Sequence, residues 1–247
     1  MKLVYLLLGA YFLFSVDIEY WYYPVIGYIF VALCNGAIAH RYFAHSQYKV
    51  NNVGRVVLGV LATIGAYSPV SYWIIQHKHH HRHSDKDKDI HNPHHGLLHA
   101  FITWPFKESV IQSVFIDNAS KILAFKCYQD RLVNILSRYF VIINVAFVII
   151  LGCISWKVLC YAYFTGYVLG FLQLGIINVV CHTKMFGCYR NFNTADNTYN
   201  NYLLGFLTLG FGWHNNHHAD ASKVNLRVKW WEIDIEYMFI RLLVKIF

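Results

Sequence analysis

Glutamate is scarce in this chain, whose 247 residues include only Glu19, Glu108, Glu232 and Glu236. None of the four stands three positions before a histidine, so the Glu-x-x-His pairs of the soluble di-iron helix bundles are absent. The His-Glu-x-x-His motif of zinc proteases is absent as well. The ligands of any metal centre in this protein therefore cannot come from either of these two motifs.

Paired cysteines and nucleic-acid-binding motifs are also lacking. The six cysteines form no Cys-x-x-Cys pair and do not have the spacing of a secreted disulfide scaffold, so we expect reduced, packed thiols. The net charge of +8 accompanies no recognisable nucleic-acid-binding motif. We therefore predict no nucleic-acid partner and assign the charge to membrane-flanking loops, anionic lipid or an anionic substrate head group.

Apolar residues, by contrast, are abundant. They make up 57% of the chain, and the mean hydropathy is +0.35, which is too apolar for a soluble domain of this length. The apolar segments are residues 3–16, 21–39, 56–75, 139–155 and 158–181. A membrane span needs about 20 residues, so the first segment is short. We still expect a span there rather than a signal peptide, because no small-residue cleavage site follows it.

Nine of the 15 histidines form clusters at the ends of apolar segments. The clusters are His40 and His45; His77, His80 and His81; His182; and His214, His217 and His218. Positions i, i+3 and i+4 share a helix face, so each H-x-x-H-H triad can present three imidazoles together. Positions i and i+5 lie about 140° apart on an ideal helix, so the first pair must straddle a helix end or a distorted turn.

Neutral imidazole is the commonest protein ligand for iron, zinc, copper and nickel. Nine imidazoles exceed the needs of one ion and suit two ions with about four or five each. The remaining histidines are expected to support the ligands or to face solvent: His79, His83, His91, His94, His95 and His99.

Membrane topology follows from the need to bring all clusters to one site on one side of the bilayer. Segment 56–75 separates two clusters, so it should dip in and return, or lie along the interface, bending near Gly65, Ser68 and Pro69. The other four segments then cross as two hairpins. Lysine and arginine lie mainly on the histidine side, which places the site in the cytosol.

The predicted fold is thus an all-α, multi-pass membrane protein with one domain over residues 1–247. Four transmembrane helices would span about 3–16, 21–39, 139–155 and 158–181, with a re-entrant or interfacial segment at 56–75. A helical cytosolic cap formed by residues 40–55, 76–137 and 182–247 would hold a histidine-ligated di-metal site. Amphipathic spacing predicts one or two helices over 117–137 and another over 230–247.

The clusters resemble those of the integral-membrane fatty acid desaturases, most closely the acyl-CoA (stearoyl-CoA) type. The matching segments are 40–45, 73–85, 178–187 and 212–218, with 230–234 beyond them. The resemblance implies two iron ions on the nine clustered histidines, with Asn178 reaching one iron through a water. It also implies that two hydrogens are removed from an acyl chain, using O2 as co-substrate and electrons from a separate donor such as cytochrome b5 or ferredoxin.

The expected substrate is a long-chain acyl thioester, most simply an acyl-CoA, at a site facing the cytosol. Basic residues near the first cluster are expected to help hold its anionic head group: Arg41, Lys49 and Arg55. Helical spacing back from the first histidine predicts the residues that line the acyl path: Gly36, Leu33, Ile29 and Tyr28. Gly36 would leave room near the irons, and Tyr28 would close the far end.

The chain departs from the family pattern near the last triad. Gly-Glu-Gly is usual there, whereas this chain has Gly210-Phe211-Gly212, and Ala219-Asp220 replaces a usual Phe-Pro pair. Two alternatives therefore stay open. A related membrane hydroxylase would give an alcohol rather than an alkene. A non-enzymatic metal transporter or sensor would hold its ligands at the bilayer midplane rather than at helix ends.

Overall fold

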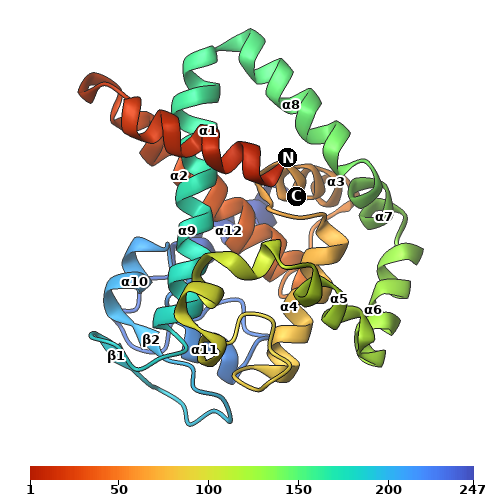
Figure 1. Cartoon of the computed structure of the whole chain (residues 1–247), viewed down its shortest axis with the longest axis vertical. Helices are drawn as coiled ribbons and strands as arrows, with labels where there is room; N and C mark the ends of the chain where they lie inside the picture. Colours follow the sequence, from red (N-terminus) through yellow and green to blue (C-terminus); the bar gives the residue numbers. More distant parts are fainter.

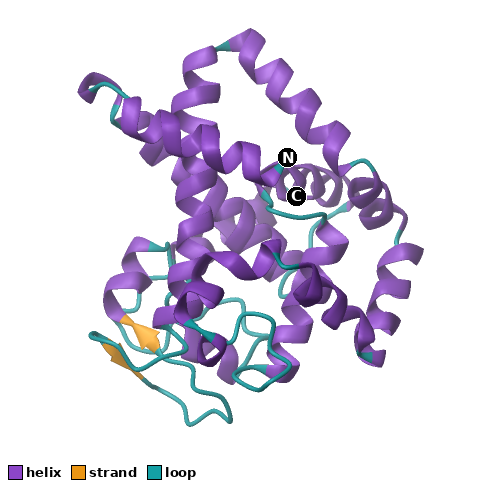
Figure 2. Cartoon of the chain, in the orientation of Figure 1, coloured by secondary structure: helices purple, strands orange, loops and turns teal.

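The computed structural model describes the backbone of residues 1–247 and all side chains except those of residues 109–111 and 116. Helices dominate it, as Figure 2 shows. The α-helices are α1 Lys2–Ser15, α2 Tyr22–Leu33, α3 Asn52–Gly65, α4 Val70–His83, α5 Glu108–Ile116, α6 Asn118–Gln129, α7 Arg131–Arg138, α8 Phe140–Ile154, α9 Thr165–Val180, α10 Tyr202–Leu207, α11 His214–Ala219 and α12 Ile235–Ile246. The 3-10 and π-helical segments are η1 Ile18–Tyr20, η2 Cys34–Ala44, η3 Pro93–His95, η4 His99–Thr103, η5 Trp104–Phe106 and η6 Val158–Phe164.

Two helices are long and apolar enough to cross a membrane. They are Ile18–Ala44, with 27 residues, and Val158–Val180, with 23 residues. Two bent pairs pass the same test together: α3 with α4, bent by 79°, and α7 with α8, bent by 66°. The apolar helix α1 has only 14 residues. The chain therefore has two to four candidate spans, and the four-span arrangement stays a prediction.

The helices α1, α2 and η6–α9 cross one another in the upper part of Figure 1 and form the apolar stem. Their backbones touch at glycines. A Cβ on Gly27 would lie 1.8 Å from the carbonyl oxygen of Ala162, and one on Gly166 would lie 2.3 Å from the carbonyl oxygen of Gly27. Small residues allow this close approach, which is how helices in a membrane gain packing contact.

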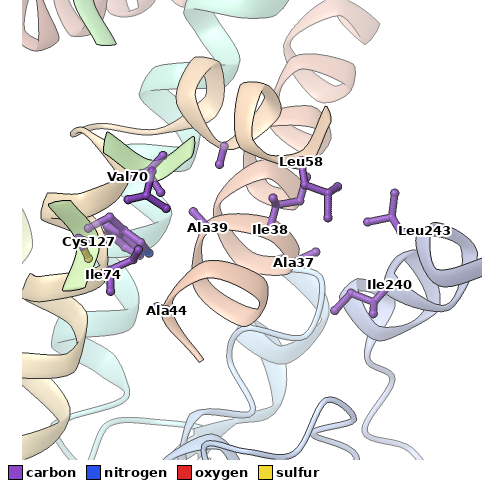
Figure 3. Packing of buried hydrophobic residues seen from close by; sticks show 13 residues of the cluster. Ala37, Ile38, Ala39, Ala44, Leu58, Val70, Ile74, Cys127, Ile240 and Leu243 are labelled. Carbon is purple, nitrogen blue, oxygen red and sulfur yellow. The ribbon is translucent and has the colours of Figure 1, made fainter. Parts of the chain in front are cut away.

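The bend expected within segment 56–75 is present between α3 and α4. Helix α3 ends at Gly65, and α4 begins at Val70, directly after Pro69. A hydrophobic core joins this bent pair to η2 and α12, and Figure 3 shows its residues facing one another. Ile38, Leu58 and Ile240 are each at most 1% exposed. This packing fixes the direction in which η2 and α4 deliver their histidines.

The cap contains the two helices expected over 117–137, namely α6 and α7. The side chains of Asp117 and Asp130 accept hydrogen bonds from backbone N–H groups in the first turns of these helices. The C-terminal helix is shorter than the predicted 230–247. It begins at Ile235, because Asp234 caps it, and residues 230–234 form a turn followed by irregular backbone instead. One short antiparallel strand pair, β1 Cys188–Tyr189 with β2 Asn200–Asn201, was not expected.

Candidate metal centre

All nine predicted histidines converge below the stem, in two groups. His40, His45, His77, His81 and His217 form a five-histidine group, and His80, His182, His214 and His218 form a four-histidine group. Within each group, one nitrogen from every ring lies within 4.8 Å of the others. The chain thus brings together five and four imidazoles, the numbers that two ions would need.

The first histidine pair meets because the helix that carries it is π-helical. Segment η2 has i to i+5 hydrogen bonding, and the N–H of His45 donates to the carbonyl of His40 at 3.0 Å. This wider winding stacks residue i above residue i+5, so the ring centroids of His40 and His45 lie 4.8 Å apart. Both rings belong to the five-histidine group. The distorted turn that the spacing predicted is therefore a π-helical segment.

Each H-x-x-H-H triad divides between the two groups. On α4, His77 and His81 face the five-histidine group, whereas His80 faces the four-histidine group. On α11 the division is reversed, so that His217 alone joins the five-histidine group. The two helices consequently bind the groups to each other, and neither group can form without both helices.

Ring nitrogens in the five-histidine group lie within hydrogen-bond distance of one another. Nε2 of His77 lies 2.7 Å from Nε2 of His45 and 3.0 Å from Nε2 of His81. Nε2 of His217 lies 3.1 Å from Nε2 of His40. Two nitrogens bound at right angles to one ion, each about 2.1 Å away, are about 3.0 Å apart. The donor set and its spacing therefore fit a metal ion.

The four-histidine group shows the same spacing, with 3.0 Å between Nε2 of His182 and Nε2 of His214. Imidazole suits iron, zinc, copper and nickel alike, so the nitrogen set by itself does not choose the element. These residues fit the two irons that the sequence resemblance implies.

Three carboxylates hold the outer ring nitrogens of the four-histidine group. The Nδ1 to carboxylate distances are 3.0 Å for His80–Asp89, 3.0 Å for His182–Asp85 and 2.7 Å for His218–Asp196. Such a partner fixes the tautomer and aims Nε2 at the ion. In the five-histidine group, Nδ1 of His40 and of His217 is buried without a partner among the described residues. The two groups therefore differ in electronic environment.

Asp196 illustrates the electrostatics of these partners. Burial alone would raise its pKa, but the hydrogen bond from His218 and the charge of that ring hold the pKa of Asp196 well below its usual range. Asp196 also accepts hydrogen bonds from the hydroxyls of Thr194 and Thr198. A carboxylate with several donors stays ionised and rigid. No local sequence pattern marks Asp196, which lies 22 positions before its histidine.

The ligand helices are anchored by acidic residues of the segment 232–236. Glu232 accepts a hydrogen bond from Asn216, which lies between the histidines of α11, and others from Tyr189 and Asn191. It is fully buried. The carboxylate thus ties α11 to the strand region and keeps its three imidazoles in place.

Arg41 does not occupy the position that the sequence suggested. Its guanidinium is 0% exposed, with Nη1 and Nη2 2.9 Å from Asp234 oxygens and Nε 2.9 Å from Glu236. The expectation that Arg41 faces an anionic head group is therefore wrong. Two carboxylates share this one cation, and burial raises the pKa of Glu236 to about 8 against the lowering effect of Arg41. The role of Arg41 is to hold η2, next to His40.

The structure also leaves little space along the acyl path that was predicted beside the second apolar segment. A Cβ on Gly36 would lie 1.7 Å from Oε1 of Glu236, so the space beside that glycine holds the glutamate. Ile29 is 40% exposed on the outside of the helix, and Leu33 is half-buried. The hydroxyl of Tyr28 donates to the carbonyl of Leu207, the last residue of α10, at 2.6 Å. The sequence spacing missed these long-range partners.

One narrow crevice adjoins the histidines instead, and a second shares part of its wall. One, of about 30 Å³, is lined by Trp73, Gln76, His77, His80, Ile90, His91, Trp104, Leu174, Asn178, Phe211 and His214. The other, of about 20 Å³, shares four of these residues, Trp73, Gln76, Trp104 and Leu174, and extends to Lys2, Tyr67 and Phe171. Together they mark an apolar route from the metal centre toward the start of α1.

Asn178 and Phe211 border this route. Asn178 lines the first crevice with His80 and His214 of the four-histidine group, and its amide lies 3.4 Å from the carbonyl of Ala100. Phe211 is 6% exposed, and its ring centroid lies 4.9 Å from that of His40. The aromatic ring therefore fills the space beside the ligands where the family usually has a glutamate.

Lys49 and Arg55 line a different cavity, of about 450 Å³, between η2, α3 and α6. Lys126 and Asp130 also line it, and Arg55 forms an ion pair with Asp130. None of the nine histidines is among its lining residues. The two basic residues thus share one cavity, but this cavity is not on the route that adjoins the metal centre.

The chain is similar to one protein family and to several named enzymes. A family model described as "Fatty acid desaturase" matches residues 4–236. The chain is 27% identical to the hex-5-enoyl-[acyl-carrier protein] acetylenase of Moorena producens, with 89% of this chain and 75% of the relative covered. It is 29% identical to the acyl-CoA C20 Delta5-desaturase of Anemone leveillei, covering 83% and 64%, and 27% identical to the sn-1 stearoyl-lipid 9-desaturase of Anabaena variabilis, covering 83% and 72%. The chain belongs to the fatty acid desaturase family.

Proposed function

We propose that this protein introduces a double bond into a long-chain acyl group, using two irons held by the nine clustered histidines. The observation that supports this most strongly is the pairing of a five-histidine and a four-histidine group beside an apolar crevice. Two bound irons would supply the O2 chemistry. Overall, –CH2–CH2– with O2, two electrons and two protons gives –CH=CH– and two waters.

The residues of the two crevices would position the acyl chain. Trp73, Trp104 and Leu174 offer apolar walls, and Gln76 is a buried polar group between them. Free volumes of about 30 and 20 Å³ are far smaller than an acyl chain, so these side chains would have to move apart when it binds. Asn178 would hold a water at the four-histidine group, because its side chain lines the crevice there.

The carrier of the acyl group is proposed to be a thioester, most simply CoA. The relatives are named for acyl-CoA, acyl-carrier protein and lipid substrates, so the names alone do not choose between carriers. Lys2 is a cation that lines the outer crevice. Lys49, Arg55 and Lys126 gather at their own cavity, which offers a second place for an anionic head group.

The setting proposed for this reaction is a multi-pass membrane protein with its metal centre facing the cytosol. Four spans would place both ends of the two hairpins, and hence all histidine clusters, on one side. A separate donor such as cytochrome b5 or a ferredoxin would supply the two electrons.

Expression in a desaturase-deficient host tests the proposal. The lipids should gain an unsaturated fatty acid whose double-bond position is read by mass spectrometry, and the His217→Ala variant should give none. An alcohol in place of the alkene would favour the hydroxylase alternative. No new product from a folded, iron-containing protein supplied with an electron donor would contradict both.

A further inference from the structure

Helix α4 carries two histidines that the di-metal centre does not use. His79 and His83 are four positions apart, so they share a face, which is turned away from His77, His80 and His81. Asp117, at the start of α6, meets this face. One ligand atom from each of His79, His83 and Asp117 lies within 4.8 Å of the others. We propose that these three residues form a third metal site, which binds one divalent transition ion of the zinc type.

The hydrogen bonds of His79 prepare it as a ligand. Its Nε2 lies 2.9 Å from the carbonyl oxygen of Lys88, and a carbonyl can only accept, so Nε2 carries the proton. Nδ1 is then left with a lone pair, which lies 3.9 Å from Oδ2 of Asp117 and 3.4 Å from the hydroxyl of Ser120, a contact that a bound ion would replace. A ring N–H donated to a backbone carbonyl is the usual partner arrangement of metal-binding histidines.

His83 supplies a second, independent indication. Its Nε2 is buried without a hydrogen-bond partner among the described residues. Its ring centroid lies 4.6 Å from that of His79. A buried ring nitrogen without a partner loses hydration and gains nothing in return, and a bound ion would compensate for that loss.

The surroundings leave an open position for the ion. Beside the cluster lies a cavity of about 550 Å³, lined by His79 and Asp117 and also by Lys88, His95 and His99. Two imidazoles and one carboxylate would leave a fourth position for water, as in three-ligand zinc sites. Arg82 lies 2.9 Å from Oδ2 of Asp117 and competes for its charge, which weakens binding.

An ion at this site would act on the main metal centre through a loop. It would fasten α4 to the start of α6 and, through the bond from His79 to Lys88, would fix the loop of residues 84–89. That loop carries Asp85 and Asp89, which hold His182 and His80. The third site would therefore stabilise the partners of the four-histidine group without touching substrate.

Metal analysis tests this inference, with the full chain purified in detergent and loaded with iron. The protein is equilibrated with Zn²⁺, free metal is removed, and zinc and iron are both measured. We expect about one zinc per chain without loss of iron. His83→Ala should weaken zinc binding at least about 10- to 100-fold, the cost of losing even an outer partner, while iron is retained.

Two further variants sharpen the result. His94→Ala, which removes an exposed histidine outside the cluster, should bind zinc like the parent chain. Arg82→Gln should bind zinc more tightly, because Asp117 loses its competing cation. Zinc that binds only as iron leaves, or equal zinc binding in His83→Ala and the parent, would overturn the proposal. The difference between these variants stands whether or not the protein desaturates lipids.

Discussion

Asp196 is a single residue on which the four-histidine group depends. It accepts the Nδ1–H of His218 at 2.7 Å and is itself held by Thr194 and Thr198. In Asp196→Asn the ring of His218 loses its charged partner and its fixed tautomer. We expect a drop of about 10- to 100-fold in iron affinity or activity. Asp87→Asn, at an exposed position in the 84–89 loop, is the matched control and should change neither.

Because burial raises the pKa of Glu236, we expect the stability of the folded protein to depend on pH. The folded-state pKa of Glu236 is raised from 4.5 to about 8, so this residue favours folding while protonated. That contribution is complete below about pH 4.5 and is lost as pH rises toward 8, by an amount on the order of a few kcal/mol. Glu236→Gln removes this titration. The melting temperature of the variant should exceed that of the parent increasingly from pH 5 to pH 8, and parallel pH profiles would argue against a protonated Glu236.

The residues that sequence analysis found and missed differ in how far away their partners lie. The nine histidines repeat at helical spacing, so local pattern identified them. Arg41 stands at the end of an apolar segment, where a membrane-flanking charge is usual, and its partner Asp234 lies 193 positions further along the chain. Gly36 likewise appeared to offer space, because the glutamate that fills it comes from α12. Pairing over such distances leaves no mark on local sequence.

Among the elements, α11 depends on a close backbone approach. A Cβ on Gly212 would lie 2.4 Å from the backbone nitrogen of Gly205 and 2.5 Å from the carbonyl carbon of Leu204. Gly212→Ala must push α11 away from α10, at a cost of about 1–3 kcal/mol in stability. Because α11 carries three of the nine histidines, iron content should fall along with the melting temperature.

A glycine on another helix provides the control for that variant. A Cβ on Gly152 would meet only a side-chain carbon of Leu159, at 3.2 Å, which can move aside. Gly152→Ala should therefore retain iron and stability. If Gly212→Ala behaves like Gly152→Ala, the contact between α10 and α11 does not set the position of the ligands.

At the scale of the whole molecule, all histidine clusters are predicted to lie on one side of the membrane. In a cysteine-free background, Lys86→Cys places a thiol on the histidine side, and Asp17→Cys places one on the loop between α1 and α2. A membrane-impermeant maleimide added to sealed vesicles should label one position and not the other. Labelling of both from the same side would contradict the two-hairpin topology.

Binding of two irons by the nine histidines can be measured by iron analysis of the purified chain. His217 is the sharpest probe, because its Nε2 lies 3.1 Å from Nε2 of His40 and 3.0 Å from Nε2 of His81. We predict about two irons per parent chain, and the same number in His94→Ala. Iron should fall in His217→Ala together with activity. One iron or none in the folded parent chain, or full iron content in His217→Ala, would rule out a di-iron centre on these nine histidines.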